Sequence, residues 1–213
     1  DVWFENAIHF IEENKDNQFF CYLATNAPHG PYHVPPKYSA PYEDSQSIPN
    51  ADFYGMITNF DENMGKLESK LNELGLTENT ILVYMTDNGT AAGVDLDQNG
   101  FVTKGYNAGM RGKKGSEYEG GHRVPFFIRW PAGGLNQGKD IETISYYADI
   151  LPTLIDLCQI PIVDTLRFDG ASLKPLLHGN DKFWQERILI VDTQREDTME
   201  YGKNSAVMTE KWR

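Results

Sequence analysis

The stretch Thr80-Ile-Leu-Val-Tyr-Met-Thr-Asp-Asn-Gly89 holds an unbroken apolar run, residues 81–85, and ends in an acid, an amide and a glycine. An apolar run of this length between turn residues is typical of a strand buried on both faces of a parallel sheet. Ligands of such sheets bind in the crevice outside the carboxyl ends of the strands. The stretch therefore predicts a site at Asp87 and Asn88, although these residue types also favour a plain turn without a ligand.

Two other apolar runs predict further strands, over residues 19–24 and 125–130. The first of them delivers His29 just beyond its carboxyl end. Prolines and tyrosines then dominate through Pro49, which predicts an irregular loop and excludes a regular helix. A glycine-rich stretch over residues 90–116 also reads as irregular, and it carries Lys114. The candidates for one site at this edge of the sheet are therefore His29, Asp87, Asn88 and Lys114.

Apolar stripes at helical spacing predict helices over residues 2–13 and 52–74, the first with Asp1 as a possible cap and the second stopped by Gly75. A third helix is expected from Asp149, as its cap, to Cys158. The order of elements predicts an α/β fold with a largely parallel sheet flanked by helices. Short strands over residues 188–191 and 205–209 are expected to pair antiparallel, so we divide the chain into residues 1–185 and 186–213.

The chain has 213 residues and a formal net charge of -12, which makes nucleic acid and anionic membranes poor partners. No apolar run approaches the length of a membrane span. The window from Lys104 to Arg129 differs from the rest, because its six basic and two acidic residues give a net charge of +4. Such a patch can focus a small anion, or it can be a solvated loop. Cys21 and Cys158 form no disulfide or metal pattern, and both are expected in the core.

The chemistry of the candidate residues points to an oxygen-ligated metal beside an anion. An Asp–Asn pair suits calcium or magnesium better than zinc, which prefers nitrogen and sulfur. Two ligands cannot complete a calcium shell, so substrate, water or further chain must supply the others. His29 can exchange a proton near neutral pH, and Lys114 lies between glycines on a permissive backbone from which it can reach an anion.

Three motifs resemble, in order and spacing, those of the type I sulfatases of the alkaline phosphatase superfamily. They are Asn26-Ala-Pro-His-Gly-Pro31, Thr86-Asp-Asn-Gly89 and Gly109-Met-Arg-Gly-Lys-Lys-Gly-Ser-Glu-Tyr-Glu-Gly-Gly-His-Arg-Val-Pro125. Residues 149–153 and 169–173 resemble later landmarks of the family. The resemblance implies an alkaline phosphatase-like fold, with residues 1–185 as the later part of a catalytic domain. Residues 186–213 would then begin a small antiparallel subdomain.

The resemblance also implies a role for each candidate residue. Asp87 and Asn88 would bind one calcium ion, and His29 would act as general acid toward the leaving alcohol. Lys114 would bind the sulfate, and Lys113 is less suited because the family lysine directly precedes a Gly-Ser or Gly-Thr pair. The implied reaction is calcium-dependent hydrolysis of sulfate esters, foremost those of carbohydrates, with small aryl or choline esters as alternatives.

One part of the family pattern does not occur in this sequence. The family nucleophile is a formylglycine made from Cys or Ser in a Cys/Ser-x-Pro-x-Arg motif, and no such motif is present. We therefore expect the 213 residues to be inactive alone and to require the remainder of their own catalytic domain as a partner. Resemblance further implies export, to the periplasm, the extracellular space or the lysosome.

Two other functions are compatible with these residues. Phosphoesterases and phosphotransferases of the same superfamily commonly have His where Asn88 stands, with a zinc or manganese site, so Asn88 favours the calcium-dependent sulfatase. The other alternative is a non-catalytic module that retains the fold.

Overall fold

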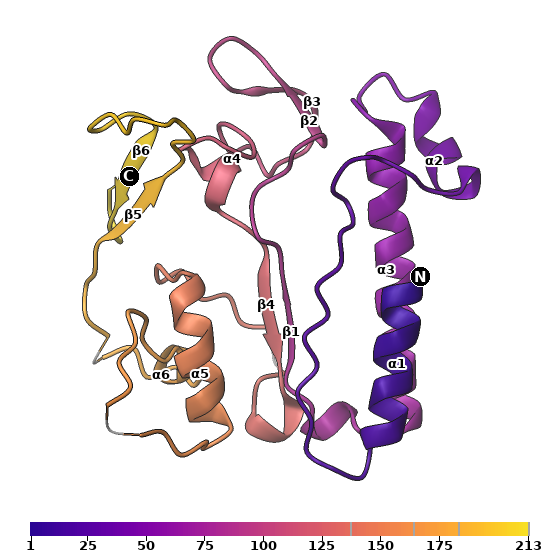
Figure 1. Ribbon diagram of the computed structural model, residues 1–213, viewed down its shortest axis with the longest axis vertical. Helices are drawn as coiled ribbons and strands as arrows, with labels where there is room; N and C mark the ends of the chain where they lie inside the picture. The colour runs from indigo at the N-terminus through magenta and orange to yellow at the C-terminus, as the bar shows by residue number, and fades with distance from the viewer. Residues whose placement is uncertain (137, 164, 183, 213) are drawn as a thin grey trace. The chain divides into compact units, whose positions relative to one another are not determined.

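The computed structural model describes residues 1–136, 138–163, 165–182 and 184–212 (Figure 1). The chain forms two compact units, Asp1–Pro131 and Ala132–Arg213. The first unit contains all four candidate site residues. In the described parts of the chain, no helix combines the length and the apolar character that crossing a membrane requires.

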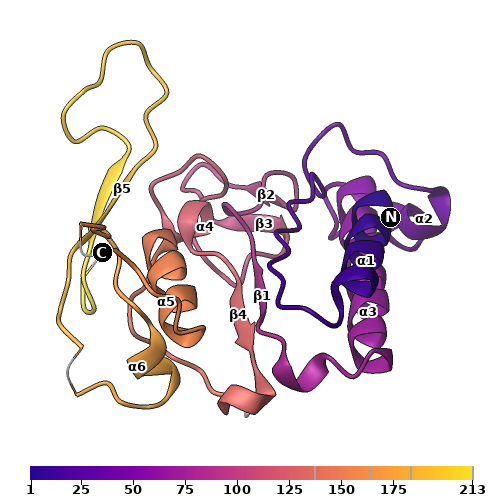
Figure 2. The same cartoon turned by 60° about the horizontal axis from the view of Figure 1, so that its bottom comes forward.

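Two helices form the core of the first unit, as predicted. Helix α1 (Val2–Asn14) packs along α3 (Ala51–Glu73), side by side in Figures 1 and 2. Their shared cluster of buried side chains comprises Phe4, Ile11, Leu67 and Leu71. Asp1 occupies the N-cap position of α1, as predicted, but its carboxylate accepts hydrogen bonds from the side chains of Asn59 and Asn63 on α3 instead of capping the helix. Gly75 ends the helical region with a φ of +68°, as the sequence predicts.

A helix over Pro36–Glu43, α2, replaces the irregular loop expected there. Proline is well tolerated in the first turn of a helix, where its missing N–H costs little. Packing against α3 stabilises α2 further. The backbone of Tyr38 and Ser39 lies so close to Gly55 that a Cβ on Gly55 would be 2.9 Å away. The hydroxyl of Tyr38 also donates to Glu62 on α3, at 2.7 Å.

Strand β1 (Leu82–Met85) pairs with β4 (Phe126–Arg129), with Leu82 opposite Arg129 and Met85 opposite Phe126. The α/β class holds, but this ladder is antiparallel where the sequence predicted parallel strands. The residues of β1 are half-buried, and antiparallel strands, unlike parallel ones, need cover on one face only. The phenyl ring of Phe60 on α3 covers Tyr84, with ring centroids 5.9 Å apart.

Residues 19–24 are not a strand, and in the described chain they join no ladder. Phe19 and Leu23 pack against the α1–α3 cluster. The side chains between them face away from it, so Phe20 is 73% exposed and Cys21 is exposed as well, contrary to the prediction for that cysteine. Cys158 is exposed too, because it lies at the C-terminal cap of helix α5 rather than on its buried side.

The glycine-rich stretch is more regular than predicted, because it contains a hairpin, and a short helix follows it. Strands β2 (Val94–Leu96) and β3 (Val102–Gly105) are antiparallel, and α4 spans Glu119–His122. The carboxylate of Asp97 shapes the hairpin turn by accepting hydrogen bonds from the backbone N–H groups of Asn99 and Phe101, at 2.8 and 2.9 Å.

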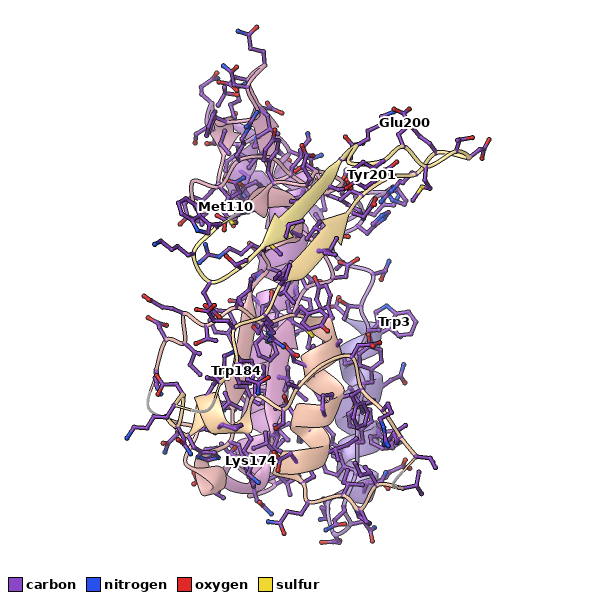
Figure 3. All side chains as sticks on the ribbon, turned by 90° about the vertical axis from the view of Figure 1, so that its left-hand side faces the viewer. Trp3, Met110, Lys174, Trp184, Glu200 and Tyr201 are labelled. Atoms are coloured by element: carbon purple, nitrogen blue, oxygen red, sulfur yellow. The ribbon has the colours of Figure 1, made fainter. Side chains whose placement is uncertain are left out.

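The second unit contains helices α5 (Ile150–Leu157) and α6 (Lys174–Leu177) and the predicted antiparallel strands β5 (Leu189–Asp192) and β6 (Ser205–Met208). Figure 3 shows Glu200 and Tyr201 in the loop that joins these two strands. Asp149 is fully buried and occupies the N-cap position of α5, as predicted, but its side chain forms no capping hydrogen bond with that helix. Its carboxylate binds the guanidinium of Arg187 and the backbone N–H groups of Tyr146 and Ala171. Its role is therefore to join separate segments of this unit.

Candidate functional site

The tip of β1 meets the helix α4 backbone to backbone. The N–H of Gly89 donates to the carbonyl oxygen of Gly121, at 2.9 Å. A Cβ at position 89 would lie 1.8 Å from the carbonyl oxygen of Gly120, a distance that no side chain can adopt. Gly89 is therefore required by this contact, rather than by the conformation of a turn.

Lys114 reaches the same tip through its main chain. Its N–H donates to the carbonyl oxygen of Thr90, two residues beyond Asn88, at 2.9 Å. The Lys114 side chain is half-buried, in a segment closed by a hydrogen bond from the N–H of Gly120 to the carbonyl oxygen of Arg111, at 2.8 Å. The structure thus brings together two of the three predicted site segments.

Asp87 and Asn88 offer an oxygen-rich edge at this tip. Asp87 is exposed, and the side-chain nitrogen of Asn88 donates to the carbonyl oxygen of Gly89, at 2.9 Å. That bond turns the amide so that its oxygen has no hydrogen-bond donor among the described residues, which suits a hard cation. The described chain contains no group of three or more His, Cys, Asp or Glu side chains that could hold a metal by itself. The pair therefore fits calcium as part of a ligand set.

His29 lies on a separate exposed turn. Its Nδ1 is 2.8 Å from the carbonyl oxygen of Gly30, and because a carbonyl only accepts, Nδ1 carries the hydrogen. Nε2 is then the nitrogen that can take or give a proton. Among the described residues, no hydrogen bond joins His29 to Asp87, Asn88 or Lys114. Phe53 of α3 lies near both segments, because its ring centroid is 5.9 Å from that of Tyr32 and a Cβ at Gly93 would lie 2.8 Å from the ring.

A surface hollow adjoins the His29 turn, but none of the four candidate residues lines it. It is lined by Tyr32, His33, Val34, Pro35 and Asp52.

Two residues that support the lysine segment were missed by the sequence analysis. Asn107 is only 8% exposed, and its amide nitrogen donates to the carbonyl oxygens of Met110 and Gly112, at 2.8 and 3.0 Å. His122 is half-buried on α4, and its Nε2 donates to the carbonyl oxygen of Glu117, at 3.2 Å. Burial lowers the pKa of His122, because it disfavours the charged imidazolium. Asn107 lies just before the third motif and had no signal in the sequence, and His122 had none beyond its place in that motif.

The sequence matches two protein-family models, which overlap in the middle of the chain. The sequence matches the family model Sulfatase over residues 1–160. It also matches the model described as N-sulphoglucosamine sulphohydrolase, C-terminal, over residues 112–213.

Individual relatives agree with these matches. An arylsulfatase of Clostridium perfringens is 35% identical over 153 residues, and a steryl-sulfatase of Rattus norvegicus is 33% identical over 172 residues. These matches cover 71% and 80% of this chain but only 28% of each relative, so the chain spans less than a third of their length.

A solved structure confirms the predicted alkaline phosphatase-like α/β fold. The crystal structure of Ps i-CgsB in complex with k-i-k-neocarrahexaose superposes with a TM-score of 0.73 at 28% identity. The match covers 84% of this chain and 38% of that one.

The backbone contact at Gly89 predicts opposite effects for two glycine-to-alanine substitutions. Gly89→Ala should lower the free energy of unfolding by about 3 kcal/mol, the upper range for forcing atoms into filled space. Gly65→Ala is the control, because Gly65 lies inside α3 with nothing within 4 Å of the new Cβ. It should stabilise the protein by roughly 0.5–1 kcal/mol through helix propensity. Urea unfolding measures both, and equal effects would contradict the contact.

The lowered pKa of His122 predicts a stability that depends on pH. The folded protein takes up this proton less readily than the unfolded chain, whose histidine titrates near 6.5. The contribution of His122 to the free energy of unfolding is therefore constant above the pKa of the unfolded chain. It falls as the pH drops from there toward the lowered pKa of the folded protein. Between about pH 7.5 and about pH 5.5, the melting temperature of His122→Gln should decline less than that of the wild type. An unchanged decline would show that His122 binds protons equally in both states.

Proposed function

The chain belongs to the sulfatase family, and we propose that it is the later part of a catalytic domain that hydrolyses sulfate esters. The observation that carries this proposal is the hydrogen bond from the Lys114 N–H to the Thr90 carbonyl oxygen. It links the backbone of Lys114 to the loop that follows Asp87 and Asn88, and a sulfate ester needs a cation where its negative charge lies.

In the proposed site, each residue has one task. Asp87 and Asn88 hold a calcium ion through their side-chain oxygens, and the bound ion supplies positive charge to the sulfate. Lys114 binds a sulfate oxygen through its ammonium group and stabilises the charge that grows there. As the bond between sulfur and the ester oxygen breaks, His29 in its imidazolium form passes the proton on Nε2 to the leaving oxygen, which departs as the alcohol.

The attacking group of this reaction is not among the residues of this sequence. We propose accordingly that the 213 residues alone do not turn over sulfate esters and that a formylglycine in the remainder of the catalytic domain supplies the nucleophile.

We propose sulfated carbohydrates as the substrate class. The family model over residues 112–213 is named for a sulphoglucosamine enzyme, and the carrageenan-type hexasaccharide is bound by a structural relative. A steryl-sulfatase among the relatives keeps aryl and steryl sulfates as the second candidate. Export from the cytoplasm remains a proposal based on resemblance to the family.

Calcium should stabilise the chain through the β1 tip. A ligand that binds only the folded state raises the melting temperature, and at one hundred times its Kd it contributes about 2.7 kcal/mol. We expect calcium to raise the melting temperature of the wild type and to have a weaker effect on Asp87→Asn and Asn88→Ala. Asp95→Asn, an exposed carboxylate on β2, is the matched control and should respond as the wild type does. A calcium response that persists in Asp87→Asn would place the ion elsewhere.

The proposed binding of sulfate by Lys114 predicts different effects for substitutions of two adjacent lysines. Lys114→Gln should weaken binding of inorganic sulfate by about tenfold, since a charge-assisted hydrogen bond contributes about 1.5–3 kcal/mol. Lys113→Gln removes the same charge one residue away and should weaken it much less. Calorimetric titration measures both variants. Equal losses would indicate a diffuse basic patch, and a larger loss at Lys113 would reverse the assignment.

A further inference from the structure

The guanidinium group of Arg111 is held in one orientation. Its Nε donates to the carbonyl oxygen of Asn99 at the tip of the β2–β3 hairpin, at 2.7 Å. Its central carbon lies 3.8 Å from the ring centroid of Tyr118 and 5.8 Å from that of Phe101. An exposed arginine usually samples many rotamers, so these contacts reduce the entropy that it would lose on binding a ligand.

The two terminal amino groups of Arg111 are available for such a ligand. In the described chain no carbonyl or carboxylate accepts a hydrogen bond from them, and Arg111 forms no ion pair. The other two arginines of the basic window are already engaged, Arg123 with Glu119 at 3.4 Å and Arg129 with Glu68 at 2.8 Å. Arg111 is therefore an exposed cation with a fixed plane and two free donors, and this fork geometry matches two oxygens of a sulfate or carboxylate.

The backbone of Arg111 belongs to the same rigid segment as Lys114. Its carbonyl oxygen accepts from the N–H of Gly120, and the N–H of the next residue, Gly112, donates to the carbonyl oxygen of Gly100, both at 2.8 Å. Figure 3 labels Met110, the residue just before it, among the side chains of this segment. Lys114 is the third residue after Arg111, so their Cα atoms lie at most about 11 Å apart.

We propose that Arg111 binds a second anionic group of the substrate, a sulfate or carboxylate on the same or the next sugar. This inference rests on the proposed function, in which Lys114 binds the sulfate that is removed. It gives the site a preference for polyanionic carbohydrates over esters with a single charge. The neighbouring Lys113 and Lys114 add positive charge that would concentrate such a ligand near Arg111 in an acidic chain.

Two disaccharides that differ by one sulfate group test the assignment. We would titrate the 213-residue chain with neocarrabiose carrying one sulfate and with neocarrabiose carrying two. The wild type should bind the disulfated sugar about tenfold more tightly, which corresponds to about 1.4 kcal/mol. Arg111→Gln should abolish this preference and leave the affinity for the monosulfated sugar unchanged. Lys114→Gln should weaken binding of both sugars.

Matched variants distinguish a fixed binding site at Arg111 from a general attraction of the ligand to positive charge. Arg123→Gln removes one positive charge from the same segment and should keep the preference, because Arg123 is paired with Glu119. Tyr118→Leu keeps the charge of Arg111 but removes the ring beneath it, so the preference should shrink. Arg111→Lys should give an intermediate preference, and it serves as the test if Arg111→Gln does not fold, as judged by circular dichroism.

Three results would overturn the proposal. They are an intact preference in Arg111→Gln, an equal loss in Arg123→Gln, and no preference for the disulfated sugar in the wild type, including failure to bind either sugar. Failure of the proposed function has a different signature, in which binding depends on Arg111 but not on Lys114.

Discussion

The candidate site depends on the contact between the backbone of Gly89 and that of Gly120 and Gly121. Two chain segments can approach this closely only when neither carries a side chain at the crossing. A glycine-rich segment loses much conformational entropy on folding, and the hydrogen bonds that fix Gly89 and Lys114 to it offset part of that loss. The lysine segment thereby becomes a rigid extension of β1, and a cation on it can have a defined position.

This rigidity matters because the chain as a whole repels anions. A net charge of -12 acts over the whole surface, while screening confines its influence to about 10 Å at moderate ionic strength. Within the basic window, two arginines pair with glutamates and contribute little net charge. Attraction for a sulfate then comes from Arg111 and the lysines of one folded segment.

The sequence predicted the elements whose information is local. The stripes of α1 and α3, the stop at Gly75 and the order of the three motifs were all visible in short windows. Helix α2 was missed because packing against Gly55 overrides the prolines. The role of Arg111 was hidden for a similar reason, since its partners Asn99 and Tyr118 lie in separate turns. The ion pair of Asp149 was hidden as well, because its partner, Arg187, lies far along the chain.

The first turn of α3 explains how the three site segments belong to one structure although only two of them touch directly. The side chain of Asn50 caps the helix by accepting from the N–H of Phe53, and the Phe53 ring packs against Tyr32 and Gly93. The neighbouring hydroxyl of Tyr54 donates to the carbonyl oxygen of Gly93 and accepts from the N–H of Tyr106. One helical turn therefore contacts the loop after His29, the loop after Asn88 and the base of the hairpin that holds Arg111. The position of His29 relative to the β1 tip is thus determined by helix packing.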